Sequence, residues 1–337
     1  MRICVVGAGA IGGLLAARLS LAGEAVTVID KGAHLEAIRR DGLKLLMHDG
    51  AEHVAKGLDA LDDPAKAGKH DLVILALKAH VIASVAPKLG ALFDDETMVM
   101  TAQNGLSWWY FQRHGGPYDA RRIQCLDPDG TIEKHIEAKR IIGCVVYPAA
   151  ELCAPGVVRH VEGDRFAVGE LDNARTERVK SVAEALTRAG FKAVIPENIR
   201  AEVWLKLWGN MSFNPISALT HATLVDICQF APTRELAAAM MREAQAVAGK
   251  LGIEFRVPLE KRIAGAEKVG SHKTSTLQDI EAGREVETDA LLGAVIELAK
   301  LTQTPVPACE SVLAMLKLLA KVLKDNHAAA RVVPIAA

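Results

Sequence analysis

The sequence feature that most constrains the fold is a GxGxxG pattern at residues 7–12. A β-branched apolar run (2–7) precedes it, an apolar stretch with helical spacing (11–23) follows, and a second β-branched run covers 25–30. In this strand–turn–helix context the glycines allow a tight turn and let backbone N–H groups approach a pyrophosphate at the helix N-terminus. The pattern therefore predicts dinucleotide binding by Gly7, Ala8, Gly9, Ala10, Ile11 and Gly12.

Alternation of short apolar runs with helical patterns continues through the first half of the chain. The expected helices cover 32–42 and about 174–190, and the expected strands cover 71–78, 97–105, 140–150, 156–164, 165–170 and 192–197. Regular strand–helix alternation predicts a parallel sheet with helices on both faces. We expect the strands between 140 and 170 to be antiparallel, with a tight hairpin turn at Gly163-Asp164. Residues 107–140 show no regular pattern.

The second half of the chain is helical throughout, and 337 residues favour two domains. Expected helices cover 200–213, 215–230, 232–251, 288–302 and 308–325. The predicted fold class is α/β, with a doubly wound dinucleotide-binding domain at 1–198 and an all-helical substrate and catalytic domain at 199–337.

Composition excludes several function classes. The net charge of -1, from 40 basic and 41 acidic residues, gives no reason to expect nucleic acid or an anionic membrane as partner. No uncharged apolar run reaches the roughly 18 residues of a membrane span. The six cysteines are widely spaced and form no CxxC pair, so we expect a reduced, cytoplasmic protein without a metal site.

The choice between NAD and NADP stays open on the residues alone. Asp30 ends the second predicted strand, where an acid can bind the ribose diol of NAD and repel the phosphate of NADP. Lys31 follows at once and can instead pair with that phosphate. His34 and Arg39 lie nearby on the next predicted helix.

Lys78 and Asn104 end two predicted parallel strands, at the edge where doubly wound sheets bind ligands. This position makes both residues candidates for ligand binding. The competing interpretations are a solvated strand terminus for Lys78 and an Asn-Gly turn for Asn104.

The stretch WLKLWGNMSFNPISAL (204–219) carries Lys206, Asn210 and Asn214 at four-residue steps along an otherwise apolar helix. Such a narrow polar stripe between large apolar side chains fits the wall of a cleft better than open surface. We also expect Asn214 to cap a new helix that begins at Pro215. The alternative is a solvent-facing lysine.

Residues 273–289 bring hydroxyl and acidic side chains, among them Ser275, Asp279 and Glu287, to the start of another predicted helix. Acids here commonly stabilise the helix N-terminus, which explains Thr288 or Asp289 but not the residues upstream.

With these motifs in order, the chain resembles the ketopantoate reductase (2-dehydropantoate 2-reductase) family. The matching elements are GAGAIG at 7–12, Lys78, QNG at 103–105, K-x-x-x-N-x-x-x-N-P at 206–215, and Ser275, Asp279 and Glu287. The resemblance implies a Rossmann domain, a helical domain and an active site in the cleft between them.

By this resemblance Lys206 is the general acid and Glu287 holds the substrate hydroxyl. Asn210, Asn214 and Ser275 bind the substrate, and Lys78 and Asn104 line the nicotinamide and substrate region. Typical NADP-dependent members place an arginine where this chain has Asp30-Lys31.

The expected function is NADPH-dependent reduction of 2-dehydropantoate to (R)-pantoate in pantothenate biosynthesis, with a small-molecule 2-keto acid as partner. Two alternatives remain: an NAD(H)-dependent enzyme for another branched 2-keto or 2-hydroxy acid, and a non-catalytic nucleotide-binding regulator. A homodimer is an assembly that the sequence allows.

Overall fold

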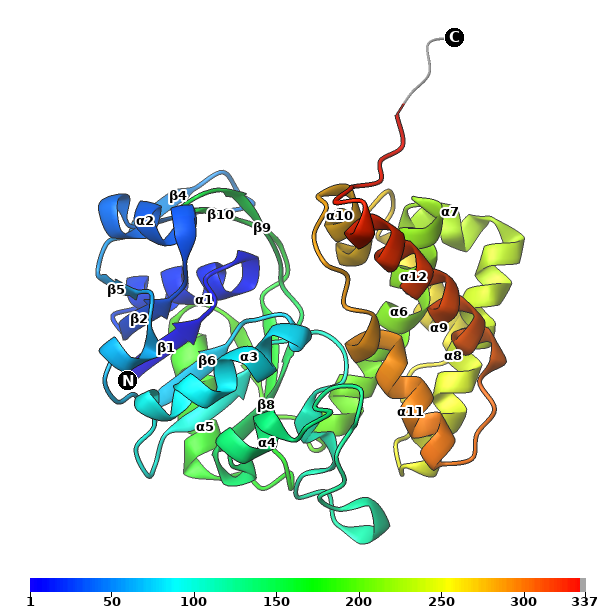
Figure 1. The fold of residues 1–337 in the computed structure, drawn as a ribbon, viewed down its shortest axis with the longest axis horizontal. Coiled ribbons are helices and arrows are strands. Elements are labelled where there is room, and N and C mark those ends of the chain that lie inside the picture. The colour runs from blue at the N-terminus through cyan, green and yellow to red at the C-terminus, as the bar shows by residue number, and fades with distance from the viewer. Residues whose placement is uncertain (334–337) are drawn as a thin grey trace. The chain divides into compact units, whose positions relative to one another are not determined.

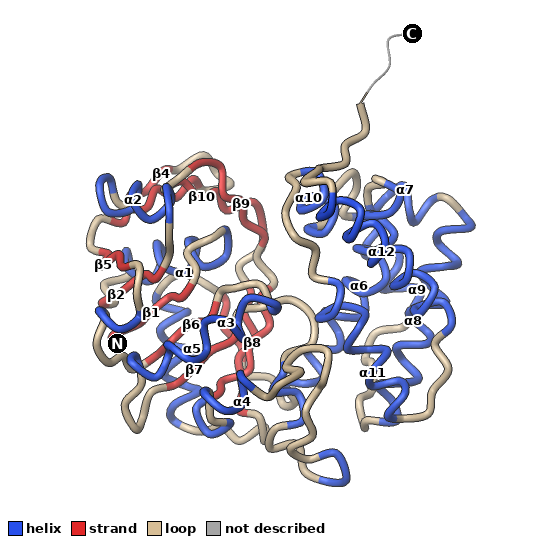
Figure 2. Tube along the Cα trace, in the orientation of Figure 1, coloured by secondary structure: helices blue, strands red, loops and turns tan. Residues whose placement is uncertain are grey.

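The computed structural model describes residues 1–333, which divide into two compact units (Figure 1). The first unit comprises Met1–Ile123 and Asp127–Glu202, and the second comprises Gln124–Leu126 and the chain from Val203 onward. The division follows Glu202 rather than residue 198, inside helix α6 (Ile199–Thr220). Strands occur only in the first unit among the described residues (Figure 2).

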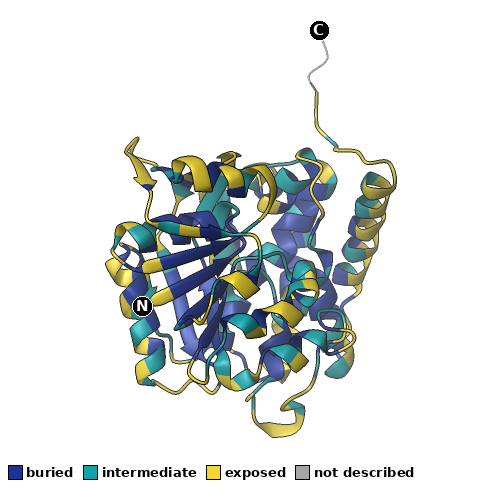
Figure 3. Cartoon of the chain, turned by 60° about the vertical axis from the view of Figure 1, so that its left-hand side comes forward, coloured by how far each residue is buried: buried dark blue, intermediate teal, exposed yellow. Residues whose placement is uncertain are grey.

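The first unit is built around an eight-stranded sheet with the order β12-β11-β8-β7-β6-β1-β2-β5. Its strands are β1 (Arg2–Val6), β2 (Ala25–Ile29), β5 (Leu58–Leu61), β6 (Leu72–Leu75), β7 (Met98–Thr101), β8 (Ile141–Val146), β11 (Arg165–Glu170) and β12 (Lys192–Val194). All neighbours are parallel except β8 and β11. Every residue of β6, β7 and β8 is buried, as expected for a parallel sheet that is covered on both faces. Figure 3 shows strands of the sheet largely in dark blue, the colour of buried residues.

The helices of this unit connect the parallel strands. They are α1 (Ala10–Leu21), α2 (Gly32–Asp41), α3 (Ala79–Leu89), α4 (Thr131–His135) and α5 (Glu177–Arg188). Leucines of α1 and valines of α5 share one buried core with the strands. The predicted doubly wound architecture of the first unit is therefore confirmed.

A second, four-stranded sheet has the order β4-β3-β10-β9, built from β3 (Leu43–Leu46), β4 (Glu52–Ala55), β9 (Ala149–Ala154) and β10 (Val157–Glu162). The predicted hairpin at Gly163-Asp164 is wrong, because β10 belongs to this small sheet and β11 to the large one. Gly163, with φ of +75°, turns the chain from one sheet to the other. The apolar alternation on either side of the turn did not reveal which partners the strands would take.

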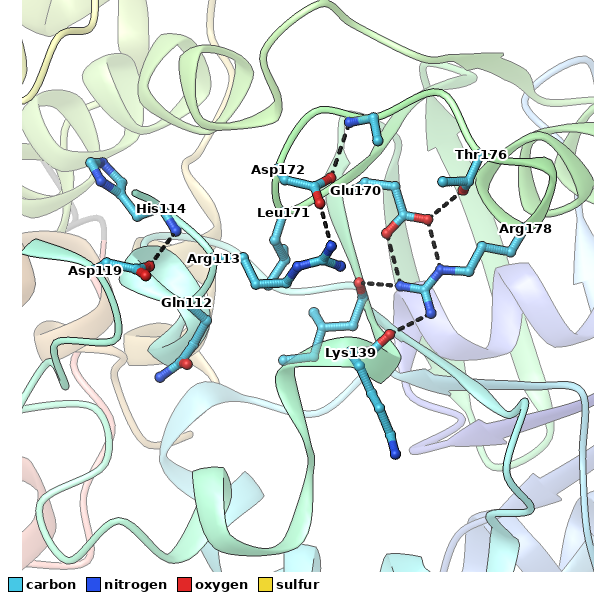
Figure 4. A network of polar contacts seen from close by, with 12 residues as sticks. Gln112, Arg113, His114, Asp119, Lys139, Glu170, Leu171, Asp172, Thr176 and Arg178 are labelled. Atoms are coloured by element: carbon cyan, nitrogen blue, oxygen red, sulfur yellow. Dashed lines mark hydrogen bonds and ion pairs between the residues drawn. The ribbon is translucent and has the colours of Figure 1, made fainter. Parts of the chain in front are cut away.

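The irregular segment before β8 is fastened to the end of β11 by charged side chains (Figure 4). Arg113 pairs with Asp172, and the buried Glu170 accepts hydrogen bonds from Arg178 and Thr176. Because Glu170 is only 1% exposed, its charge depends on these donors.

The first turn of α6 is also held within this unit. The buried guanidinium of Arg200 donates to the carbonyl oxygens of Tyr110 (2.6 Å), Gln112 (2.8 Å) and Leu171. Gly143 and Gly169 face each other across β8 and β11, and Ile199 fills the space that their missing side chains leave. A Cβ at either glycine would lie about 3 Å from an Ile199 carbon.

The second unit is helical. It contains α6 from Val203 onward, followed by α7 (Leu224–Gln229), α8 (Ala231–Lys250), α9 (Leu259–Lys268), α10 (Ser275–Glu281), a π-helical turn (Asp289–Gly293), α11 (Ala294–Leu301) and α12 (Pro307–Asp325). Among the described residues, no helix has the length and apolar character needed to cross a bilayer.

Two expectations for this unit are wrong: that a new helix begins at Pro215, and that Asn214 caps it. Helix α6 runs unbroken through Pro215, so Asn214 lies inside a helix and does not cap a new one. Proline costs the helix one backbone hydrogen bond, but residues 211–218 are all buried, and this packing stabilises the turn. The break comes at His221, which has φ of +59°, and α7 then starts at a capping box formed by Thr223 and Asp226.

Candidate functional site

The glycine-rich loop between β1 and α1 has two glycines that the protein itself requires and one that faces open space. A Cβ on Gly7, which has φ of +90°, would lie 2.6 Å from a Leu77 methyl carbon, and a Cβ on Gly12 would lie 1.8 Å from the Gly7 carbonyl oxygen. A Cβ on Gly9 would meet no atom within 4 Å. The loop is thus closely packed on its protein side and open at Gly9.

The N-terminus of α1 is suited to bind an anion. The 12-residue helix has Gly9 at its N-cap position and no side-chain cap. Its first N–H groups have no partner within the helix, and the helix dipole favours negative charge there. A dinucleotide pyrophosphate fits this donor set and the open space at Gly9. Ala10 and Ile11 open the helix as the motif predicts.

Asp30 follows β2 and holds the main chain on two sides. Its Oδ2 accepts the Ala8 N–H (2.7 Å) and its Oδ1 accepts the Lys31 N–H (2.7 Å). The carboxylate therefore shapes the loop besides placing a negative charge at this edge. Lys31 is exposed at the N-cap position of α2, whereas Arg39 donates to the Ala60 carbonyl oxygen and to Glu36.

Lys78 and Asn104 lie at the same edge of the sheet, because β6 and β7 are adjacent and parallel. Lys78 occupies the N-cap position of α3, and Asn104 lies three residues beyond the end of β7; both are half-buried. The Gln103 amide donates to the Leu77 carbonyl oxygen (3.2 Å) and ties the two loops together. Sequence reasoning gave Gln103 no role, although it is the first residue of the QNG motif.

In the second unit, α6 carries the polar stripe. Lys206 and Asn210 are half-buried and Asn214 is 7% exposed, whereas Trp204 and Trp208 are completely buried. The Asn214 amide donates to the hydroxyl of Ser275 at 3.4 Å. Two separately predicted substrate residues therefore lie side by side.

The segment around α10 is ordered by local contacts. The Thr274 hydroxyl caps α10 by accepting the Leu277 N–H, and Asp279 pairs with Arg284 at 2.7 Å. Glu287 is half-buried and lies two residues before the π-helical turn. Thr288 is at the N-cap position of that turn but makes no side-chain cap bond, so the expected cap is absent there. Within residues 1–333, no three His, Cys, Asp or Glu side chains are grouped to hold a metal ion.

Comparisons with known proteins match both units of the chain. The family model described as "Ketopantoate reductase PanE/ApbA" matches residues 3–111, and "Ketopantoate reductase PanE/ApbA C terminal" matches residues 198–320. A 2-dehydropantoate 2-reductase of Mesorhizobium japonicum is 49% identical over 95% of this chain and 98% of its own length. Another, of Pyrococcus horikoshii, is 31% identical over 91% of this chain and 93% of its own length.

Solved structures share the fold. A crystal structure of a candidate ketopantoate reductase from Ralstonia solanacearum has a TM-score of 0.91 and 39% identity, covering 96% of this chain and 98% of that one. A D-mandelate dehydrogenase with NADH and anilino(oxo)acetate has a TM-score of 0.82 at 23% identity, over 96% of this chain and 99% of its own, a likeness of fold alone.

The fold and the matched regions define a nicotinamide-dinucleotide-dependent oxidoreductase with a Rossmann-like first unit and a helical second unit. More narrowly, the chain belongs to the ketopantoate reductase family.

Proposed function

We propose that this protein reduces 2-dehydropantoate to (R)-pantoate with NADPH, a step of pantothenate biosynthesis. The observation that carries the proposal is the 49% identity, over nearly the whole of both chains, to a protein named 2-dehydropantoate 2-reductase. The glycine loop, the lysine-bearing polar stripe and the Asn214–Ser275 contact support it.

The reaction adds a hydride to the carbonyl carbon of the 2-keto acid and a proton to its oxygen. The nicotinamide supplies the hydride when it is bound. Lys206 gives the proton to the developing alkoxide as general acid, and its positive charge stabilises that oxygen. A lysine also attracts the substrate electrostatically before the transfer.

The other site residues orient the substrate. Asn210, Asn214 and Ser275 offer amide and hydroxyl donors for the carboxylate of the substrate. These donors are neutral, so they add no further charge to the site. Glu287 accepts a hydrogen bond from the substrate hydroxyl, so analogues without that hydroxyl leave its carboxylate unpaired and react poorly. Lys78 and Asn104 border the nicotinamide and substrate region at the sheet edge.

For the cofactor we infer NADPH, bound by Gly7–Gly12 at the N-terminus of α1 with the adenosine phosphate near Lys31. NADH is the alternative, because Asp30 places a carboxylate at the end of β2. The D-mandelate dehydrogenase of the same fold was solved with NADH. We further propose a cytoplasmic enzyme that acts on a small molecule.

A homodimer is the assembly that we propose. A ketopantoate reductase from Staphylococcus aureus, with a TM-score of 0.72 at 19% identity, is described as dimeric. Sedimentation of this protein at micromolar concentration tests the assembly, and a single monomer-sized species would contradict it.

A substrate panel with both nucleotides tests the function. We expect the highest kcat/KM for 2-dehydropantoate with NADPH, above that for 2-ketoisovalerate, which lacks the hydroxyl that Glu287 would accept. Efficient turnover of another 2-keto acid with negligible turnover of 2-dehydropantoate would contradict the proposal. Nucleotide binding without turnover of any 2-keto acid would favour the non-catalytic regulator.

A further inference from the structure

Both backbone polar groups of Ala8, the second residue of the glycine loop, are held by side chains. Its N–H donates to Asp30 Oδ2 at 2.7 Å, and its carbonyl oxygen lies 2.8 Å from His34 Nε2. Asp30 directly follows β2, and His34 lies in the first turn of α2. The peptide groups of this loop residue are therefore fixed from the β2–α2 connection.

The hydrogen bonds of His34 identify its tautomer. Its Nδ1 accepts the backbone N–H of Gly156 at 2.9 Å. A backbone N–H only donates, so Nδ1 carries no proton in this arrangement. The proton of the neutral ring is then on Nε2, which donates it to the Ala8 carbonyl oxygen. The imidazole thus connects two backbone groups that are far apart in the sequence.

Gly156 lies in the turn that connects β9 and β10 of the small sheet. It has φ of +74°, its carbonyl oxygen accepts the Lys44 N–H of β3 (2.8 Å), and a Cβ on it would lie 3.0 Å from the Ala37 Cβ. The same sheet also contacts α1 directly after the motif, because a Cβ on Gly13 would lie 2.7 Å from a Val158 methyl carbon. The small sheet therefore supports both the loop and the helix that follows it.

We propose that His34 is a positioning residue for nucleotide binding, which donates to the Ala8 carbonyl oxygen and so holds the glycine loop in its binding conformation, while the Gly156 N–H orients the imidazole ring. The proposal rests on dinucleotide binding by this loop and not on the identity of the keto acid. His34 acts through Ala8 and the loop rather than through the reacting atoms. Its loss should weaken nucleotide binding and leave the chemical step intact.

Three substitutions separate the two hydrogen bonds. His34→Gln keeps a donor near the position of Nε2, His34→Asn keeps an acceptor near the position of Nδ1, and His34→Leu keeps neither. The dissociation constant of the nucleotide is measured by titration of each purified variant, together with kcat at saturating nucleotide and the melting temperature.

We expect His34→Leu and His34→Asn to raise the nucleotide Kd by about tenfold, the order expected when a part-buried hydrogen bond that fixes a binding loop is lost. His34→Gln should stay within about threefold of the wild type, and kcat at saturation should be unchanged in all three. Gly156→Ala, which disturbs the turn at a positive φ, should raise the Kd as well. Combined with His34→Leu, it should add less than its separate effect.

Wild-type nucleotide affinity in a folded His34→Leu variant would overturn the proposal. Equal losses in the Gln and Asn variants would also overturn it, since a merely structural histidine would not distinguish them. A fall in kcat at unchanged Kd would do the same. If His34→Leu does not fold, the contrast between Gln and Asn decides. Because nucleotide Kd is measured without a keto acid, failure of the proposed substrate leaves these outcomes unaffected.

Discussion

The side-chain amide of Asn214 donates a hydrogen bond to the hydroxyl of Ser275, at 3.4 Å and across 61 positions of sequence. Asn214 belongs to the polar stripe of α6, and Ser275 is the first residue of α10. Two motifs that the sequence offers separately thus meet within the helical unit. We expect this contact to form part of the substrate-binding surface of the proposed site.

Replacement of Lys206 by alanine should lower kcat by at least about a hundredfold, the usual effect of losing a general acid. Steady-state kinetics with saturating keto acid and nucleotide measure the change. Lys321→Ala is the matched control, because Lys321 is exposed on α12 and forms an ion pair with Asp325, one turn further along the same helix. Near-normal turnover in the Lys206 variant would remove this residue from the mechanism.

Glu287→Gln should reduce kcat/KM for 2-dehydropantoate by about tenfold to a hundredfold, because an amide is a weaker acceptor for the substrate hydroxyl than a carboxylate. Nucleotide affinity should change little. Glu285→Gln, at an exposed position two residues away, serves as the control. Unchanged kinetics would assign Glu287 to the end of the helix alone.

Asp30→Asn should shift the ratio of kcat/KM values toward NADPH by about tenfold if the negative charge repels the adenosine phosphate. Asparagine is preferable to alanine here, because its amide oxygen can still accept the Ala8 N–H that Asp30 holds. Lys31→Ala should shift the ratio the other way. An unchanged ratio in the Asp30→Asn variant would show that this charge does not select the cofactor.

His70 should make stability depend on pH. It is 4% exposed, accepts from the Thr27 hydroxyl through Nε2 and donates to the Gly68 carbonyl through Nδ1, and burial lowers its pKa. The unfolded chain therefore binds a proton near its ordinary pKa of about 6.5, before the folded protein does. The free energy of unfolding should fall as the pH drops below that value, and level off below the folded-state pKa.

Urea unfolding at pH 7.5 and 5.5 checks this expectation. A single histidine contributes at most about 1.4 kcal/mol per pH unit, which sets the upper limit of its share below about pH 6.5. His70→Gln should lose less stability on acidification than the wild type, by no more than that limit. Equal losses in both proteins would contradict the assignment.

The large sheet and the glycine loop were predictable because their signals are local. β-Branched runs mark the buried parallel strands, and the glycine spacing marks the turn before α1. The small sheet was not predictable, since β3 and β4 have only four residues each and β10 joins β3 across more than a hundred positions. Short strands with distant partners carry little pattern of their own.

For the site, residue type and spacing selected the polar stripe and the family resemblance selected Ser275, but neither showed which residues would lie beside them. The Asn214–Ser275 contact depends on how α10 packs, and the His34–Gly156 bond spans 122 positions. The predicted helix break at Pro215 was wrong because it followed local propensity, which opposes a helix there. Burial of the surrounding turn outweighs the lost hydrogen bond. Such long-range contacts form only in the folded tertiary structure, so the local sequence pattern does not indicate them.

Ile199, seated over the paired Gly143 and Gly169, bears on how relatives of this protein could be recombined. Exchange of helical units between family members at the start of α6 would separate this isoleucine from the glycines that accommodate it. It would also remove Arg200 from its three carbonyl partners. A chimera joined after Glu202 keeps that first turn with its native sheet, and Gln124–Leu126, which belong to the helical unit, would have to be exchanged together with it.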